Sequence, residues 1–159
     1  MQFEKVLVLV TGQKSDATAV DQAASLVRDS HGKLIVLYVI RMARSLPLDS
    51  EVPGQVERGE AVLQQAEQIS RLPRSDVEAE LLQAREVGPA VVHEAAVRDV
   101  DAIVIGTGYP LEVGGFSLGK DIPYVLEYAA CAVILVREPV GPARAERREL
   151  VGRAATRTG

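Results

Sequence analysis

A glycine-rich segment, residues 106–121, holds the residues of this chain that are best suited to binding an anion. Its sequence is GTGYPLEVGGFSLGKD, and it follows an apolar run at residues 102–105. Glycine lets backbone N–H groups approach a ligand closely, and a helix N-terminus favours negative charge. The segment therefore predicts a phosphate-binding loop, although the same composition suits a connection that only needs tight turns.

Two general phosphate-binding patterns fit this segment poorly. The dinucleotide pattern GxGxxG fails because Leu111 stands at its third glycine. The pattern GxxxxGK[ST] nearly fits residues 114–121, but Asp121 replaces the serine or threonine whose hydroxyl normally holds the metal ion. That loop should also leave its strand directly, and several residues intervene here. We therefore treat both matches as coincidental.

Four continuous apolar runs and one partly alternating run predict the strands that position this segment. Continuous runs are typical of strands buried on both faces, as in a parallel sheet covered by helices. The alternating run favours an edge strand with one wetter face. The continuous runs are residues 6–10, 34–40, 102–105 and 132–136, and the alternating run is 77–84.

Amphipathic stretches between these runs predict four helices. We expect Ser15 to cap the first helix and Gly32 to end it in the left-handed conformation, after His31. The helices are expected at about residues 15–30, 53–72, 88–96 and 121–130.

Strands and helices thus alternate along the whole chain. Right-handed crossovers wrap such a chain into an α/β fold, a three-layer, doubly wound, parallel five-stranded sheet, with strand order 3-2-1-4-5 if the first strand is central. In open sheets of this kind, ligands bind beyond the C-terminal strand ends where the strand order reverses. That rule selects residues 10–13 and 106–120 as the candidate site.

Composition excludes several classes of function. A net charge of −4 makes nucleic acid an unlikely partner, and a single cysteine, Cys131, excludes an internal disulfide. His31 and His93 lack metal-ligand spacing, so no metal site is expected. The hydrolase elbow GxSxG and paired carboxylates are missing, so we do not expect an enzyme. The N-terminus lacks the form of a signal peptide and no run would span a membrane, which favours a cytoplasmic protein.

A more specific pattern, G-x2-G-x9-G-[ST], fits the glycine-rich segment at its first and last glycines, Gly106 and Gly119. With it, the chain resembles the universal stress protein family from about residue 3 to residue 137. The opening strand, the fourth strand, and the final helix and strand also look like that family; they are residues 5–10, 100–106, 124–126 and 130–137.

The resemblance implies an adenine nucleotide alpha-hydrolase-like fold and a bound ATP or AMP, with magnesium only as the ion that accompanies the nucleotide. The residues that it implies at this site are Val10, Thr11, Val39, Gly106, Gly108, Tyr109, Gly119 and Lys120. Three of them depart from the family pattern: Thr11 replaces an aspartate, Tyr109 a glycine, and Lys120 a serine or threonine. Tyr109 would either plug the site or stack on a ligand. Lys120 would either contact phosphate through its charge or lie in solvent.

These departures leave two main hypotheses. The first is a small regulatory protein that binds an adenine nucleotide at the ends of strands 1 and 4. The second is a nucleotide-independent module that acts through its dimer surface or through residues 41–52, a long loop suited to be a lid or a partner contact. A hydrolase or transferase that uses the glycine-rich loop is a third, weaker reading.

The resemblance also implies a homodimer through the last strand, residues Ala132–Arg137, whose apolar edge would pair with a second copy. The domain is expected to cover residues 1–139. Residues 140–159 form an arginine-rich tail, which we expect to be flexible apart from one short helix near residues 143–150.

Overall fold

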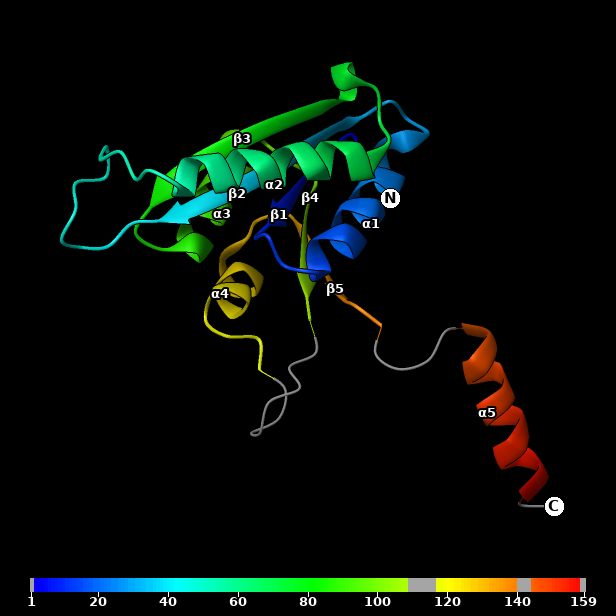
Figure 1. The fold of residues 1–159 in the computed structure, drawn as a ribbon. Coiled ribbons are helices and arrows are strands. Elements are labelled where there is room, and N and C mark those ends of the chain that lie inside the picture. Colours follow the sequence, from blue (N-terminus) through cyan, green and yellow to red (C-terminus); the bar gives the residue numbers. More distant parts are fainter. Residues whose placement is uncertain (1, 109–116, 140–143, 158–159) are drawn as a thin grey trace.

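The computed structural model describes residues 2–108, 117–139 and 144–157, and it has the predicted doubly wound architecture (Figure 1). Five parallel strands form one sheet in the order β3-β2-β1-β4-β5, which confirms the predicted order 3-2-1-4-5. The strands are β1 (Lys5–Val10), β2 (Lys33–Arg41), β3 (Val77–Ala84), β4 (Ala102–Thr107) and β5 (Ala132–Arg137).

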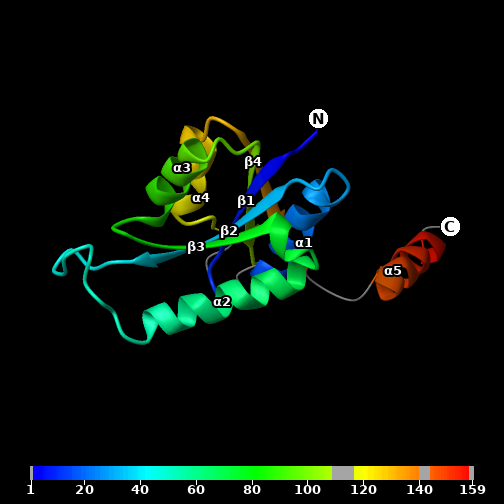
Figure 2. The same cartoon turned by 90° about the horizontal axis from the view of Figure 1, so that it is seen from above.

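Two helices cover each face of the sheet. Helices α1 and α2 lie on one face, and α3 and α4 lie on the other (Figure 2). Each lies within a few residues of its predicted range: α1 (Ser15–Arg28), α2 (Gln55–Ser70), α3 (Val87–Val97) and α4 (Asp121–Tyr128), with a short 3₁₀ turn, η1 (Arg74–Asp76).

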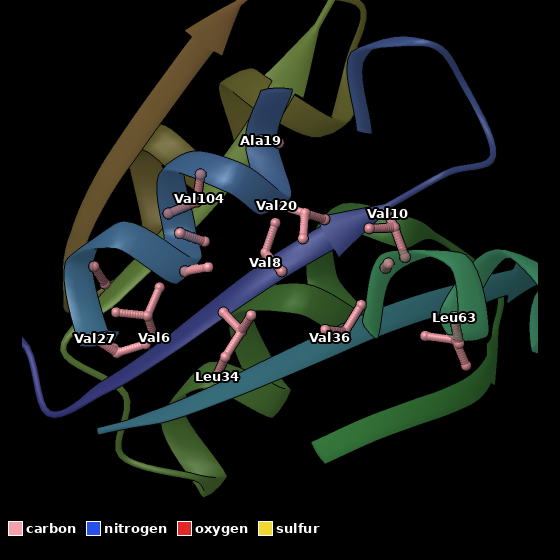
Figure 3. Close-up of a cluster of buried hydrophobic side chains, with 14 residues drawn as sticks. Val6, Val8, Val10, Ala19, Val20, Val27, Leu34, Val36, Leu63 and Val104 are labelled. Carbon is pink, nitrogen blue, oxygen red and sulfur yellow. The ribbon is translucent and has the colours of Figure 1, made fainter. Parts of the chain in front are cut away.

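The central strand β1 divides the apolar core into two halves. Val6, Val8 and Val10 point to α1 and α2 (Figure 3), whereas Leu7 and Leu9 point to α3 and α4. All five side chains are buried. This two-sided burial explains why the apolar run of β1 is continuous, since both faces of a parallel strand contact helices.

The two predicted ends of α1 are wrong in detail. Lys14, not Ser15, is the N-cap residue, and its side chain makes no capping hydrogen bond; Ser15 is buried inside the first turn. At the other end, the residue with a left-handed backbone is His31, with φ of 53°. Gly32 is required for a different reason, because a Cβ there would lie 2.5 Å from the carbonyl oxygen of Glu4.

The arginine-rich tail contains a helix, α5 (Arg144–Arg157), that is longer than the short one expected from the sequence. It lies apart from the sheet and its helices (Figure 1). Among the residues that the structure describes, no helix has both the length and the apolar character needed to cross a membrane.

Candidate functional site

The C-terminal ends of β1 and β4 lie side by side, as the topology predicted. The parallel register pairs Leu9 with Ile105, so Val10 and Gly106 follow next to each other at the edge of the sheet. Thr11 and Gly108 are exposed beyond them. Tyr109 lies outside the described residues. The structure thus brings together the predicted residues at the ends of β1 and β4, which are Val10, Thr11, Gly106 and Gly108.

Gly106 has a packing role that the sequence did not reveal. A Cβ at this position would lie 2.6 Å from the carbonyl oxygen of Ser15 and 3.0 Å from Cβ of Ala19. Helix α1 therefore packs directly against the backbone of β4 at this point. Gly108 differs, because a Cβ there would meet no atom within 4 Å. The first glycine of the family pattern is thus explained by packing before any ligand is considered.

The other end of the glycine-rich segment leads into α4. Gly119 has φ of 67°, a conformation that favours glycine, and its N–H donates to Oγ of Ser117 at 3.2 Å. Lys120 follows as the N-cap residue of α4, and its Nζ lies 3.5 Å from a carboxylate oxygen of Glu86. Both side chains of this ion pair are exposed, so Lys120 is held only weakly.

A carboxylate is present at the end of β1 although Thr11 replaces the expected aspartate. The two oxygens of Asp16 accept hydrogen bonds from the backbone N–H of Thr11 at 3.0 Å and of Gly12 at 2.7 Å. Asp16 lies in the first turn of α1. Sequence reasoning missed it because it follows the strand by several residues. The signal that would have found it is an acidic residue shortly after a glycine, since Gly12 has φ of 83° and turns the chain back.

A cavity of about 470 Å³ at this edge of the sheet is lined by four cationic side chains from three different loops. Arg41 ends β2 and Arg44 follows it, Arg85 follows β3, and Lys120 precedes α4. The guanidinium group of Arg85 donates to the carbonyl oxygen of Ala43, which joins two of these loops. We call this cavity the basic cleft. Apart from Lys120, its cations were not predicted, because they come from segments that are far apart in the sequence.

The loop after β2, residues 41–52, is fixed to β3 at two points. The N–H of Met42 donates to the carbonyl oxygen of Ala84 at 2.7 Å, and Nε2 of Gln83 donates to the carbonyl oxygen of Ser50 at 2.8 Å. Met42 is buried, whereas Leu46 and Leu48 between the two points are 43% and 47% exposed. The loop therefore holds Arg44 near the basic cleft and presents two leucines to solvent.

Val39 is half-buried near the C-terminal end of β2, on the face covered by α3 and α4. Its side chain packs with the cluster that includes Leu9 and Leu37. Val39 therefore lies on the sheet face that α3 and α4 cover, and it is not among the residues that line the basic cleft.

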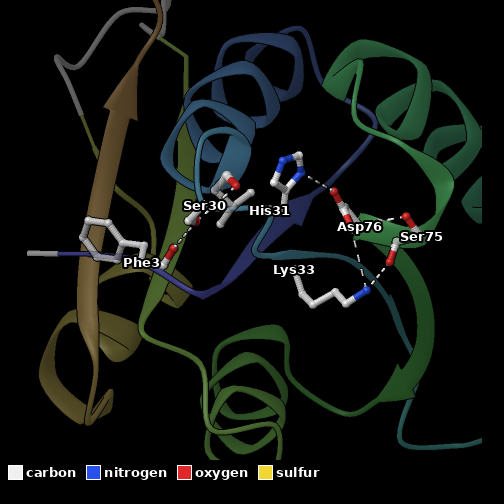
Figure 4. Close-up of polar contacts among 7 residues, drawn as sticks. Phe3, Ser30, His31, Lys33, Ser75 and Asp76 are labelled. Atoms are coloured by element: carbon white, nitrogen blue, oxygen red, sulfur yellow. Dashed lines mark hydrogen bonds and ion pairs between the residues drawn. The ribbon is translucent and has the colours of Figure 1, made fainter.

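The surroundings of the two histidines do not indicate a catalytic or metal-binding role. His31 is exposed and pairs with Asp76, which also faces Lys33 (Figure 4). His93 is exposed on α3. Within the described part of the chain, no group of three histidine, cysteine or acidic side chains is arranged to hold a metal ion.

Cys131 is half-buried. Removal of its thiol from solvent raises its pKa above the ordinary value, because burial disfavours the charged thiolate. The thiolate is the nucleophilic form of cysteine, so this thiol is poorly reactive at neutral pH.

Similar folds occur in several solved structures. The universal stress protein from Archaeoglobus fulgidus is 21% identical, with a TM-score of 0.69 over 83% of this chain and 97% of that one. The same protein in complex with dAMP is 20% identical, with a TM-score of 0.66 over 86% of this chain and 99% of that one. A universal stress protein in complex with cAMP is 20% identical, with a TM-score of 0.65 over 87% and 100%.

Comparison of the sequence alone gives two results. No curated protein matches it significantly. The family model of the universal stress proteins, in contrast, matches residues 2–137, which include all five strands and the first four helices. This match covers most of the chain and agrees with the strand order and the solved structures. The chain therefore belongs to the universal stress protein family.

Proposed function

We propose that this protein is a small regulatory protein that binds an adenine nucleotide at the C-terminal edge of its sheet. The basic cleft is the observation that supports the proposal, because Arg41, Arg85 and Lys120 gather positive charge at the C-terminal edge of the sheet. Two similar solved structures are described as complexes with cAMP and dAMP. Those ligands combine an apolar, planar base with a phosphate group.

The charged side chains suggest how the phosphates are held. The family pattern offers backbone N–H groups and a hydroxyl at position 120, where this chain has a lysine. Asp16 already accepts the N–H groups of Thr11 and Gly12, so these donors are occupied. In our proposal the phosphates therefore contact Arg41, Arg85 and Lys120, and the base lies toward Val39. Charged donors make stronger hydrogen bonds to phosphate than neutral ones.

Thermal unfolding with ATP or AMP, with and without magnesium, tests the proposal. A nucleotide at about 100 times its dissociation constant should stabilise the protein by about 2.7 kcal/mol. Lys120→Gln should reduce this gain, whereas Arg71→Gln, a change of an arginine on the α1 and α2 side, should leave it unchanged. No shift at millimolar nucleotide would contradict the proposal. We expect no rapid turnover, so sustained phosphate release by the wild type but not by Lys120→Gln would also contradict it.

The second candidate is a nucleotide-independent module that contacts a protein partner. The exposed Leu46 and Leu48 favour it, because the loop that carries them is anchored and yet presents apolar side chains to water. The packing role of Gly106 removes one argument for a nucleotide. A wild-type protein that shows no nucleotide shift would favour this candidate.

In both cases we propose a homodimer formed through β5. Among the described residues, this strand pairs only with β4, and all but the last of its side chains are half-buried. Light scattering should give twice the chain mass for the wild type. Val136→Lys should give the single mass with an unchanged circular dichroism spectrum, while Leu126→Lys, at an exposed residue of α4, should remain dimeric. A monomeric wild type would contradict the proposal. A cytoplasmic location remains a prediction.

A further inference from the structure

A cavity larger than the basic cleft adjoins it at the end of β3 and the start of α3. Its volume is about 950 Å³, in the range of small-molecule sites. Its walls include the apolar side chains of Leu82, Ala84, Pro89 and Ala90. We call it the β3–α3 groove. The nucleotide proposal does not use this cavity, since only Arg85 among its lining residues enters that proposal.

The charges around the β3–α3 groove are not balanced. Of its two acidic residues, Glu86 faces Lys120 at 3.5 Å, and Glu94 accepts a hydrogen bond from Nε of Arg98 at 2.7 Å. Arg44 has no ion pair among the described residues, and Arg85 donates to a carbonyl oxygen, which does not cancel its charge. Both cavities share Arg44, Arg85 and Glu86, so the end of the groove that adjoins the basic cleft carries two cations and one carboxylate, which faces Lys120.

We propose that the β3–α3 groove binds a small amphipathic organic anion. The apolar body of this ligand would lie along Leu82, Pro89 and Ala90, and its carboxylate or phosphate group would contact Arg44 and Arg85. The combination of an apolar wall and two cations at one end matches this class and disfavours two alternatives. A neutral apolar molecule would leave the arginines unused, and a bare anion would leave the apolar wall exposed to water.

Calorimetric titration with decanoate tests this inference, with decanol and acetate as probes of the two halves of the ligand. We expect saturable binding of one decanoate per chain, and at least tenfold weaker binding of decanol and of acetate. Arg44→Gln should weaken decanoate binding several-fold, because the exposed arginine supplies only charge. Arg71 lines a separate cavity of about 470 Å³ against α2. The variant Arg71→Gln is therefore the matched control and should bind decanoate normally.

A second variant separates this site from the nucleotide site. Ala90→Phe should fill the groove and abolish decanoate binding, while any nucleotide-induced thermal shift is retained. Lys120→Gln should reduce the nucleotide-induced shift, while decanoate binding should persist. Equal affinity for decanol and decanoate, or unchanged binding by both Arg44→Gln and Ala90→Phe, would overturn the inference. The inference would also be overturned if the protein self-associated, decanoate did not affect this association, and Ala90→Phe abolished it. A second copy of the chain would then occupy the groove.

Discussion

The two edges of the sheet differ in how their cationic side chains are paired. At the N-terminal edge, the carboxylate of Asp101 accepts the backbone N–H groups of Glu4 and Lys5 at 2.8 and 2.9 Å, and Nζ of Lys5 donates to the carbonyl oxygen of Arg98. Arg98 itself contacts three carboxylates at 2.7–2.9 Å, those of Glu78, Glu80 and Glu94. These contacts raise the pKa of Arg98 still further above its ordinary value, so its charge is permanent.

At the C-terminal edge the cations are largely unbalanced. Among the described residues, Arg41 and Arg44 have no ion pair, and Lys120 has a single exposed one. Both edges belong to the same parallel strands, so backbone geometry alone does not explain the difference. Charges at the N-terminal edge join the strands to the helices, whereas those at the C-terminal edge are available to an anion from solution. Two of the three predictions below test this contrast, and the other tests the packing role of a glycine at the C-terminal edge.

The largest effect is expected from Arg98→Met at the N-terminal edge. Removal of the guanidinium group leaves three carboxylates facing one another without a cation, and we expect a loss of about 2–3 kcal/mol in the free energy of unfolding. Urea unfolding at pH 7 measures it. Arg44→Met is the matched control at the other edge and should change stability by less than about 0.5 kcal/mol. Equal losses in the two variants would remove the contrast.

A smaller effect is expected from Gly106→Ala, which asks whether a residue of the candidate site is structural. The added methyl group would lie 2.6 Å from the carbonyl oxygen of Ser15, so α1 must shift away from β4. We expect a loss of about 2 kcal/mol in thermal or urea unfolding without any ligand. Gly108→Ala, with open space around it, should change stability by only a few tenths of a kcal/mol. If both variants were as stable as the wild type, the packing explanation would be wrong.

The smallest effect has the opposite sign. The double variant Arg41→Gln, Arg44→Gln removes two like charges from the C-terminal edge, where they repel Arg85 and Lys120. We expect a gain in stability of a few tenths of a kcal/mol at low salt, which disappears at about 1 M salt because the interaction is screened. Melting temperatures at the two salt concentrations measure it. A loss of stability at low salt would show that the arginines have partners at this edge as well.

The sequence predicted the fold well because the fold depends on patterns that are local in the chain. The continuous apolar runs correspond to β1, β2, β4 and β5, and the alternating run matches β3 residue for residue. The helix ends were predicted less well. His31 takes the left-handed conformation that the sequence assigned to Gly32, because Gly32 is needed for close contact with Glu4.

The candidate site was predicted only in part because it is assembled from separate loops. The topology correctly placed Val10 beside Gly106. The sequence did not reveal that Arg41, Arg85 and Lys120 line one cavity, since nothing in their spacing relates them. It also did not show that Asp16 supplies a carboxylate next to Thr11, because the turn at Gly12 brings that side chain back to the strand end.

The close contact between α1 and β4 has a consequence for the interpretation of related sequences. A side chain at position 106 is excluded by the carbonyl oxygen of Ser15, whether or not a nucleotide is ever bound. Selection for a stable monomer is then sufficient to keep this glycine in descendants that have lost the ligand. In such lineages the presence of this glycine reflects the packing of α1 on β4. Residues that this packing does not constrain, such as Gly108, are then the ones that indicate whether a ligand is bound.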